Sequence, residues 1–209
     1  MRWLILLCLT GSLAHAEGER PGAFDYYVLS LSWSPSWCAL SGDAQGSAQC
    51  DGTRDFGWVL HGLWPQNTRG YPSYCHSPLP APSRAMTNDM VDIMGTSGSA
   101  WHQWKKHGVC SGLEAADYYA LAREAYVRIK RPAALRELKK PVTLPAKLVE
   151  EAFIKDNPEL EPNMITITCQ SGRIQEARIC LSKALIPVPC GSDVVRDCTL
   201  NDALLDPVR

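Results

Sequence analysis

The chain has 209 residues, 45% of them hydrophobic and 21% charged, and a formal net charge of −1 at pH 7. These totals are ordinary for a globular protein of one domain. They argue against a protein that wraps a long nucleic acid, because such proteins are usually basic. Any nucleic acid bound here is therefore expected to be held through one or two phosphates. After residue 16, no segment is long and apolar enough to span a bilayer.

In chain order, the first 16 residues have the pattern of a secretory signal peptide. Arg2 supplies a positive charge, residues 3–9 form a short apolar run, and residues 14–16 (Ala-His-Ala) fit the small-x-small cleavage pattern. A buried N-terminal strand or helix is the alternative. We expect cleavage after residue 16, which leaves residues 17–209 as one domain.

Removal of the signal deletes one of the nine cysteines and leaves an even number. Behind a signal peptide, an even count favours disulfides formed in an oxidising compartment. A zinc site is disfavoured because no Cys-x-x-Cys pair is present. The remaining cysteines can pair in too many ways for their number to determine the connectivity. They are Cys38, Cys50, Cys75, Cys110, Cys169, Cys180, Cys190 and Cys198.

The first predicted element of the mature chain is a strand at residues 27–33. Apolar residues alternate there with mostly polar ones, including Ser30 and Ser32, which is nearly the period of a strand with one polar face. Pro35 is expected to stop this strand. The following residues, 38–54, are rich in Gly, Ser, Asp and Gln and predict a loop.

The second predicted strand, residues 56–61, is apolar on both faces, as expected of a buried central strand. Gly62 and Pro65 are expected to end it. His61 would then lie at the end of a rigid element, which suits a catalytic group. Residues 66–85 contain several prolines and predict an extended loop.

The rest of the chain predicts helices interspersed with strands. Gly95 interrupts the first helical stretch and Gly108 is expected to stop the second. Mixed elements without a strict βα rhythm indicate an α+β fold around an antiparallel or mixed sheet. The predicted helices are residues 86–94, 101–107, 114–130, 133–139 and 146–155. The predicted strands are residues 165–168 and 178–181.

Two short blocks, residues 56–65 and 101–110, contain three of the five histidines and four of the seven tryptophans, together with lysine. They read Phe-Gly-Trp-Val-Leu-His-Gly-Leu-Trp-Pro and Trp-His-Gln-Trp-Lys-Lys-His-Gly-Val-Cys. Paired imidazoles beside a cation suit the cleavage of a phosphodiester, which needs a base, an acid and a group that stabilises charge. On a helix, Gln103 and His107 share a face with Lys106 beside them.

The two blocks resemble the active-site segments of the RNase T2 family, the acid-type transferase ribonucleases. The first matches the family's His-Gly-Leu-Trp-Pro. The second matches His-Glu-Trp-x-Lys-His-Gly-Thr-Cys except at Gln103, where Glu is usual, and at Val109, where Thr is usual. Residues 24–38 and 178–183 extend the resemblance. It implies an α+β fold with a mostly antiparallel central sheet, several helices and stabilising disulfides.

The resemblance also implies an endoribonuclease that cleaves single-stranded RNA without a metal or other cofactor and forms 2′,3′-cyclic phosphate ends. His107 would be the base on the 2′-OH, and His61 the acid on the leaving 5′ oxygen. Lys106 would neutralise the phosphoryl oxygens and His102 would help to seat the phosphate, with Gln103 completing the catalytic set. DNA would not be a substrate, since it lacks the 2′-OH.

For the base, the resemblance implies that Trp64 is a stacking platform, and stacking contributes roughly 1–3 kcal/mol per base. Gln66 and one of Tyr71 or Tyr74 are further candidates for the same pocket. Trp64 could instead belong to the core. The remaining tryptophans are expected in the core: Trp33, Trp37, Trp58, Trp101 and Trp104.

The resemblance further implies the disulfides Cys75–Cys110, Cys169–Cys198 and Cys180–Cys190, which leaves Cys38–Cys50. The protein is expected to be a secreted or periplasmic monomer of the bacterial type, without membrane attachment once the signal is cleaved.

Each histidine also has a structural interpretation. His61 could be a satisfied structural residue, His107 could stabilise a helix C-terminus, and His102 could lie on the surface. His102 and His107 are five residues apart, which disfavours a zinc site on one helical face. His76 and Lys105 match no motif and are expected to be exposed.

Two other classes of protein remain open. One is a catalytically weakened family member that binds RNA or a protein partner, supported only by Gln103. The other is an unrelated disulfide-rich binding domain whose histidines are structural.

Overall fold

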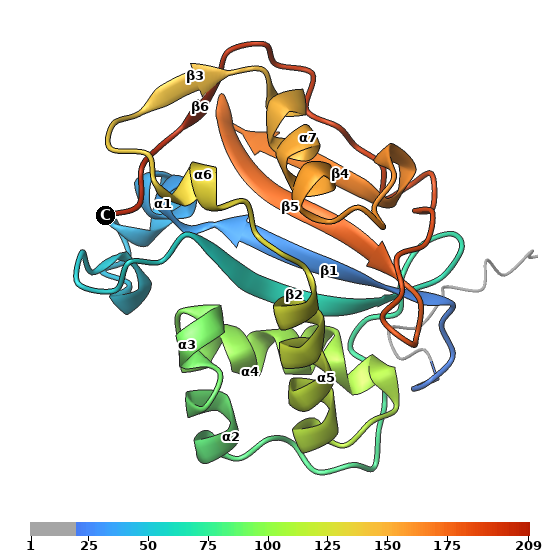
Figure 1. The fold of residues 1–209 in the computed structure, drawn as a ribbon. Helices are drawn as coiled ribbons and strands as arrows, with labels where there is room; N and C mark the ends of the chain where they lie inside the picture. Colours follow the sequence, from blue (N-terminus) through green and yellow to red (C-terminus); the bar gives the residue numbers. More distant parts are fainter. Residues whose placement is uncertain (1–19) are drawn as a thin grey trace, which may run out of the picture.

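A computed structural model describes residues 20–209 (Figure 1). The predicted signal peptide lies outside these residues. Within them, six strands form one sheet in the order β2-β1-β5-β6-β3, and β4 also pairs with β5. All strand pairs are antiparallel except a single parallel contact between β5 and β6. The strands are β1 (Tyr26–Trp33), β2 (Trp58–Gln66), β3 (Val142–Leu144), β4 (Ile165–Gln170), β5 (Arg173–Leu181) and β6 (Ala203–Leu205).

Helices α2 to α5 gather on the β2 side of the sheet, and α7 packs against β4 (Figure 1). None of the helices in residues 20–209 combines the length and the apolar composition needed to cross a membrane. The helices are α1 (Ser34–Trp37), α2 (Arg84–Asn88), α3 (Val91–Met94), α4 (Ser97–Lys106), α5 (Ala115–Arg128), α6 (Ala133–Arg136) and α7 (Ala146–Asp156). A π-helical turn (Cys38–Gly42) and the 3-10 turns Ala48–Cys50, Gly108–Ser111 and Pro162–Met164 complete the regular elements.

This architecture is the α+β class that the sequence predicts, with a mostly antiparallel sheet and several helices. The disulfides are the four pairs that the resemblance implies: Cys38–Cys50, Cys75–Cys110, Cys169–Cys198 and Cys180–Cys190. Helices α5 and α7 match their predicted ranges to within two residues.

Strand β1 lies between β2 and β5 and is buried on both faces. Its apolar face joins the main core, where the rings of Trp33 and Trp58 lie 5.1 Å apart. The polar face predicted for this strand is buried as well, and Ser30 is fully inaccessible. The polar side chains on this face, such as Ser30, therefore lie inside the fold.

Strand β2 differs from the prediction, because it continues through Gly62 and Pro65 to Gln66. Pro65 is tolerated since β2 is at the edge of the sheet, where a missing N–H costs no strand pairing. His61 is consequently not at a strand end. Ser30 pairs with Gly62 and the next residue with Leu60, so His61 is the extra residue of a β-bulge. A bulge redirects a side chain, and bulges are frequent beside active sites.

Two more predictions are corrected by tertiary contacts. The loop predicted at residues 38–54 contains a π-helical and a 3-10 turn joined by the Cys38–Cys50 disulfide. The single helix predicted at residues 86–94 is split into α2 and α3. Arg123 binds the carbonyl oxygen of Asp89 at 2.6 Å, which removes that acceptor from a continuous helical ladder.

The strand predicted at residues 178–181 begins earlier, at Arg173. Ser171 and Gly172, both with positive φ, form a two-residue hairpin turn between β4 and β5. Helix α4 is also longer than predicted, because Thr96 caps it by accepting a hydrogen bond from the Ser99 amide at 3.0 Å. Helix α6 ends earlier than predicted, and the short strands β3 and β6 were not predicted.

Candidate active site

A cavity of about 480 Å³ opens between the sheet and helix α4, and both sequence blocks line it. Eight of its lining residues are predicted site residues: His61, Trp64, Gln66, Tyr71, His102, Gln103, Lys106 and His107. The other lining residues are Val28, Gly70, Arg178, Asp193, Val194 and Arg196.

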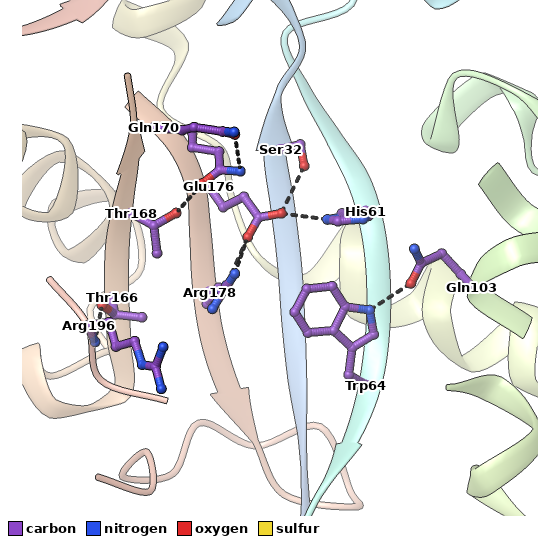
Figure 2. Close-up of polar contacts among 11 residues, drawn as sticks. Ser32, His61, Trp64, Gln103, Thr166, Thr168, Gln170, Glu176, Arg178 and Arg196 are labelled. Atoms are coloured by element: carbon purple, nitrogen blue, oxygen red, sulfur yellow. Dashed lines mark hydrogen bonds and ion pairs between the residues drawn. The ribbon is translucent and has the colours of Figure 1, made fainter. Parts of the chain in front are cut away.

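The His61 imidazole is oriented by Glu176 of β5. Nδ1 of His61 lies 2.5 Å from Oε1 of Glu176, whose side chain is only 2% exposed. The other carboxylate oxygen accepts hydrogen bonds from Nε and Nη2 of Arg178 at 2.9 and 2.6 Å. Figure 2 shows these contacts, with Ser32 donating to the same carboxylate from β1.

Glu176 is ionised in this setting. Burial alone would raise the pKa of Glu176, but the hydrogen bond and charge of His61, together with Arg178, lower it to about 2. An ionised carboxylate only accepts hydrogen bonds, so Nδ1 of His61 carries a proton toward it. Nε2 is then the His61 nitrogen that can exchange a proton in the cavity.

His107 has a different environment at the C-terminus of α4. The residue is 5% exposed, and its Nδ1 has no hydrogen-bond partner within residues 20–209. Burial lowers the pKa of His107 to about 3, and the charges of Lys106, His61 and His102 act in the same direction. The imidazole is therefore neutral near pH 7 and can accept a proton.

Trp64 packs against both imidazoles. Its indole stacks on the His107 ring with centroids 5.1 Å apart, and it meets the His61 ring edge-on at the same distance. The indole N–H donates to Oε1 of Gln103 at 2.8 Å (Figure 2). A Cβ atom at Gly62 would lie 2.3 Å from the indole nitrogen and 2.6 Å from the Gln103 oxygen. Only glycine at this position permits that hydrogen bond.

Gln103 is 4% exposed, and its orientation is set by Trp64. Because Oε1 accepts the indole proton, the amide nitrogen Nε2 is the polar atom left for other partners. It makes no hydrogen bond to the described part of the chain. Lys106 and His102 line the cavity from the same helix, so α4 supplies all the predicted phosphate-side groups.

The base-side candidates separate into two groups. Gln66 and Tyr71 line the cavity with Trp64, whereas Tyr74 is not among its lining residues. Tyr74 is exposed, and its backbone amide donates to the Lys106 carbonyl oxygen at 2.9 Å. Tyr71 is thus the tyrosine that the fold brings to the site.

Other predictions about individual residues have mixed outcomes. His76 and Lys105 are exposed, as expected. Trp33, Trp58 and Trp104 are buried. The prediction for Trp101 is wrong, because this side chain is 43% exposed on the outer face of α4. Trp37, the last residue of α1, is only partly buried.

Sequence reasoning missed Glu176, which lies behind His61, and three charged cavity residues: Arg178, Asp193 and Arg196. A signal for the first two was present, since two charged residues alternate in a strand between Ile174, Ala177 and Ile179. Buried charges usually occur as pairs. Asp193 and Arg196 lie in an irregular segment whose sequence has no comparable signal.

One compact group of potential metal ligands occurs within residues 20–209: Cys38, Asp43 and Cys50. Both cysteine sulfurs belong to a disulfide, so neither is a thiolate that could bind a metal ion. This group also lies on the α1 side of the fold, in a segment that does not line the cavity.

Comparisons with known proteins identify the family of the chain. The chain belongs to the ribonuclease T2 family, whose model matches residues 24–190. A ribonuclease of Aeromonas hydrophila is 41% identical over 124 residues, which cover 59% of this chain and 54% of that protein. A probable ribonuclease of Haemophilus influenzae is 35% identical over 130 residues, which cover 56% and 48%. The chain thus spans about half the length of these two relatives.

The fold is also found in solved structures. An RNase-related protein from Calystegia sepium has a TM-score of 0.67 at 17% sequence identity. The match covers 90% of this chain and 100% of that one. The likeness establishes the fold.

Proposed function

We propose that the chain is an endoribonuclease that cleaves single-stranded RNA by transphosphorylation, without a metal ion. One observation carries the proposal: two imidazoles in different electrostatic environments lie in one cavity. His61 is hydrogen-bonded to an ionised, buried carboxylate, whereas His107 is kept neutral by burial. An acid and a base in fixed positions are what a transphosphorylation needs.

In the proposed reaction, His107 removes the proton from the RNA 2′-OH, and that oxygen attacks the adjacent phosphorus. His61 donates its Nε2 proton to the 5′ oxygen that leaves. Lys106 neutralises charge on the phosphoryl oxygens, and His102 helps to seat the phosphate. The products are a 2′,3′-cyclic phosphate and a free 5′-OH, and water can later open the cyclic ester with the two histidines exchanging roles.

Glu176 acts through His61 in this proposal, whereas Gln103 faces the phosphate. Glu176 fixes the tautomer and orientation of His61, and stabilises the ring when it is charged. Gln103 is held by Trp64 with its amide N–H groups unused, so they are available to a phosphoryl oxygen. Each positioned acid or base typically contributes about 10²–10⁴ in rate.

The base of the attacking nucleotide binds beside Trp64, with Gln66 and Tyr71 lining the same space. His107 stacks on Trp64, so the aromatic surface left for a base includes the exposed Tyr71 ring. We propose no role for Tyr74 in binding. Because the nucleophile belongs to the substrate, DNA of the same sequence is not cleaved.

The proposed mature protein is residues 17–209, a single catalytic domain released by cleavage of a signal peptide at residues 1–16. The four disulfides support a secreted or periplasmic location, since such bonds persist in oxidising compartments. A relative of this chain is named an extracellular ribonuclease in Solanum lycopersicum. We propose that the protein acts as a monomer.

The test is cleavage of single-stranded RNA by the purified, oxidised protein, with and without EDTA. The expected result is EDTA-resistant cleavage with 2′,3′-cyclic phosphate ends, and no turnover of the matched DNA. Measurable DNA cleavage would contradict the mechanism. No RNA cleavage by correctly oxidised protein would favour the weakened family member, in which the chain binds RNA or a protein partner without catalysis.

A further inference from the structure

Residues 190–198 form one wall of the cavity and are fixed to the sheet at both ends. Cys190 is bonded to Cys180 of β5, and Cys198 to Cys169 of β4. Between these disulfides, Val194 is 6% exposed and packs against the sheet. The backbone amide of Arg196 donates to Thr166 Oγ1 at 3.1 Å. The cavity-facing part of this segment therefore has a defined position.

Two guanidinium groups lie on this side of the cavity, on Arg178 of β5 and on Arg196 of the 190–198 segment. Nε and Nη2 of Arg178 both bind Glu176, which fixes the group and leaves Nη1 unengaged within residues 20–209. Arg196 forms no ion pair with any described residue. The acid on the same wall, Asp193, accepts from the Gly70 amide through Oδ2 at 2.6 Å, and its Oδ1 is buried without a hydrogen-bond partner in residues 20–209.

These arginines are separated from the groups that hold the scissile phosphate. His102 and Lys106 come from α4, beside β2, whereas β1 lies between β2 and β5. The guanidinium carbon of Arg178 lies 5.5 Å from the centre of the Trp64 ring, and the His107 ring stacks on the same indole with centroids 5.1 Å apart. In Figure 2, Arg178 and Arg196 lie on the opposite side of Trp64 from Gln103. A strand that carries successive phosphates can therefore place one phosphate near α4 and the next near the arginines.

We propose that Arg178 and Arg196 bind a second phosphate of the RNA, the one on the 5′ side of the nucleotide whose 2′-OH attacks. The inference rests on the proposed function. That nucleotide lies beside Trp64, and its 5′-phosphate leads away from the scissile bond toward the sheet wall. Guanidinium groups bind phosphate oxygens through directed, charge-assisted hydrogen bonds. Arg178 supplies a fixed donor, and Arg196 closes the site from the 190–198 segment.

The experiment compares a dinucleoside monophosphate, NpN, with the same molecule carrying a 5′-phosphate, pNpN. In the wild type, the added phosphate is expected to raise kcat/KM about five- to tenfold, mainly through a lower KM. Arg196→Gln should reduce that gain to less than about twofold while leaving NpN cleavage unchanged. Arg196→Lys should retain part of the gain. Added salt should diminish it in the wild type, because the attraction is partly screened.

Arg136→Gln is the matched control. Arg136 is exposed on α6 and does not line the cavity. Its substitution removes the same charge as Arg196→Gln, so the gain from the 5′-phosphate should persist. The proposal is overturned if the wild type shows no gain, or if Arg196→Gln lowers cleavage of NpN and pNpN equally. An equal, Arg196-dependent gain from a 3′-phosphate (NpNp) would also overturn it. Arg196 would then attract any added phosphate through its charge, with no specific site for the 5′-phosphate. Failure of the wild type to cleave either RNA substrate would instead refute the proposed function.

Discussion

The indole N–H of Trp64 donates to the side-chain oxygen of Gln103 across Gly62, so one hydrogen bond joins the two sequence blocks. The amide oxygen is occupied by this bond, and the amide nitrogen remains. A glutamate could accept the same indole proton while placing a second, charged oxygen where the amide nitrogen lies. The chain's main departure from the family motif is therefore a change of charge at a position where the hydrogen bond to Trp64 can be kept.

Gln103→Glu should raise the pKa of His107, because a nearby anion favours the imidazolium form. The acid limb of the pH–rate profile should then move to higher pH, since the base must be neutral to act. We expect kcat at mildly acidic pH to be maintained or increased, because His107 would still be largely neutral there and would be a stronger base. The measurement is a pH–rate profile of both proteins with NMR titration of His107. Gln103→Met removes both the acceptor for Trp64 and the amide donor without adding a charge, so it separates the effect of charge from the loss of polar groups.

Loss of activity in Gln103→Glu would show that the amide donor is required. In that case the site has adapted to Gln103, and the substitution is not a tolerated loss of charge.

Glu176→Gln removes the charge that orients His61 and preserves the size of the side chain. We expect kcat to fall about 10- to 100-fold, as part of the 10²–10⁴ that a positioned acid contributes. KM should change little, because Glu176 touches no substrate. The pH–rate limb assigned to His61 should move as well, which a purely structural role would not cause. An unchanged profile with a normal kcat would remove Glu176 from the mechanism.

His61→Ala and His107→Ala should each lower kcat by at least ~10² with the fold retained. The control is His76→Ala, because this exposed histidine lies outside the cavity. Circular dichroism of all three variants checks the fold, and single-turnover cleavage of RNA gives the rates. Equal damage from the His76 substitution would mean that the site is assigned to the wrong residues.

Acid should destabilise the protein through His107. Its pKa is about 3 in the folded chain against an ordinary value of 6.5, so between these pH values only the unfolded chain binds the proton. The free energy of unfolding should therefore decrease as pH falls through this window, by up to ~1.4 kcal/mol per pH unit. Glu176, whose pKa is lowered from 4.5 to about 2, adds to the loss only below about pH 4.5.

Urea unfolding at about pH 7, 6 and 5 measures the slope of the free energy of unfolding against pH. His107→Phe keeps an aromatic ring against Trp64 and does not titrate, so its slope over the same range should be smaller. Identical slopes in the two proteins would contradict a buried, neutral His107.

The Cys75–Cys110 disulfide ties the loop after β2 to the end of the second block. The double substitution of both residues by serine should lower the free energy of unfolding by about 2–4 kcal/mol. Peptide mapping of the native protein should recover this bridge. Free thiols at both positions in active protein would exclude it.

The sequence by itself determined the features that depend on near neighbours. The 3.6-residue period fixed α5 and α7, the alternation of residues 27–33 fixed most of β1, and the two blocks identified six of the cavity residues. The even number of cysteines indicated disulfides, and the resemblance to a family, rather than their spacing, implied the correct pairing. These signals are local, so one chain segment is sufficient to recognise each of them.

Only the tertiary structure decided the environment of each catalytic group. Glu176 is 115 residues from His61 and reaches it because β5 pairs with β1, which pairs with β2. The neutral state of His107 depends on burial by other elements, and Pro65 fits its strand only because β2 is at the sheet edge. Strand order, desolvation and bulges arise from contacts between distant segments, so no local pattern in the sequence encodes them.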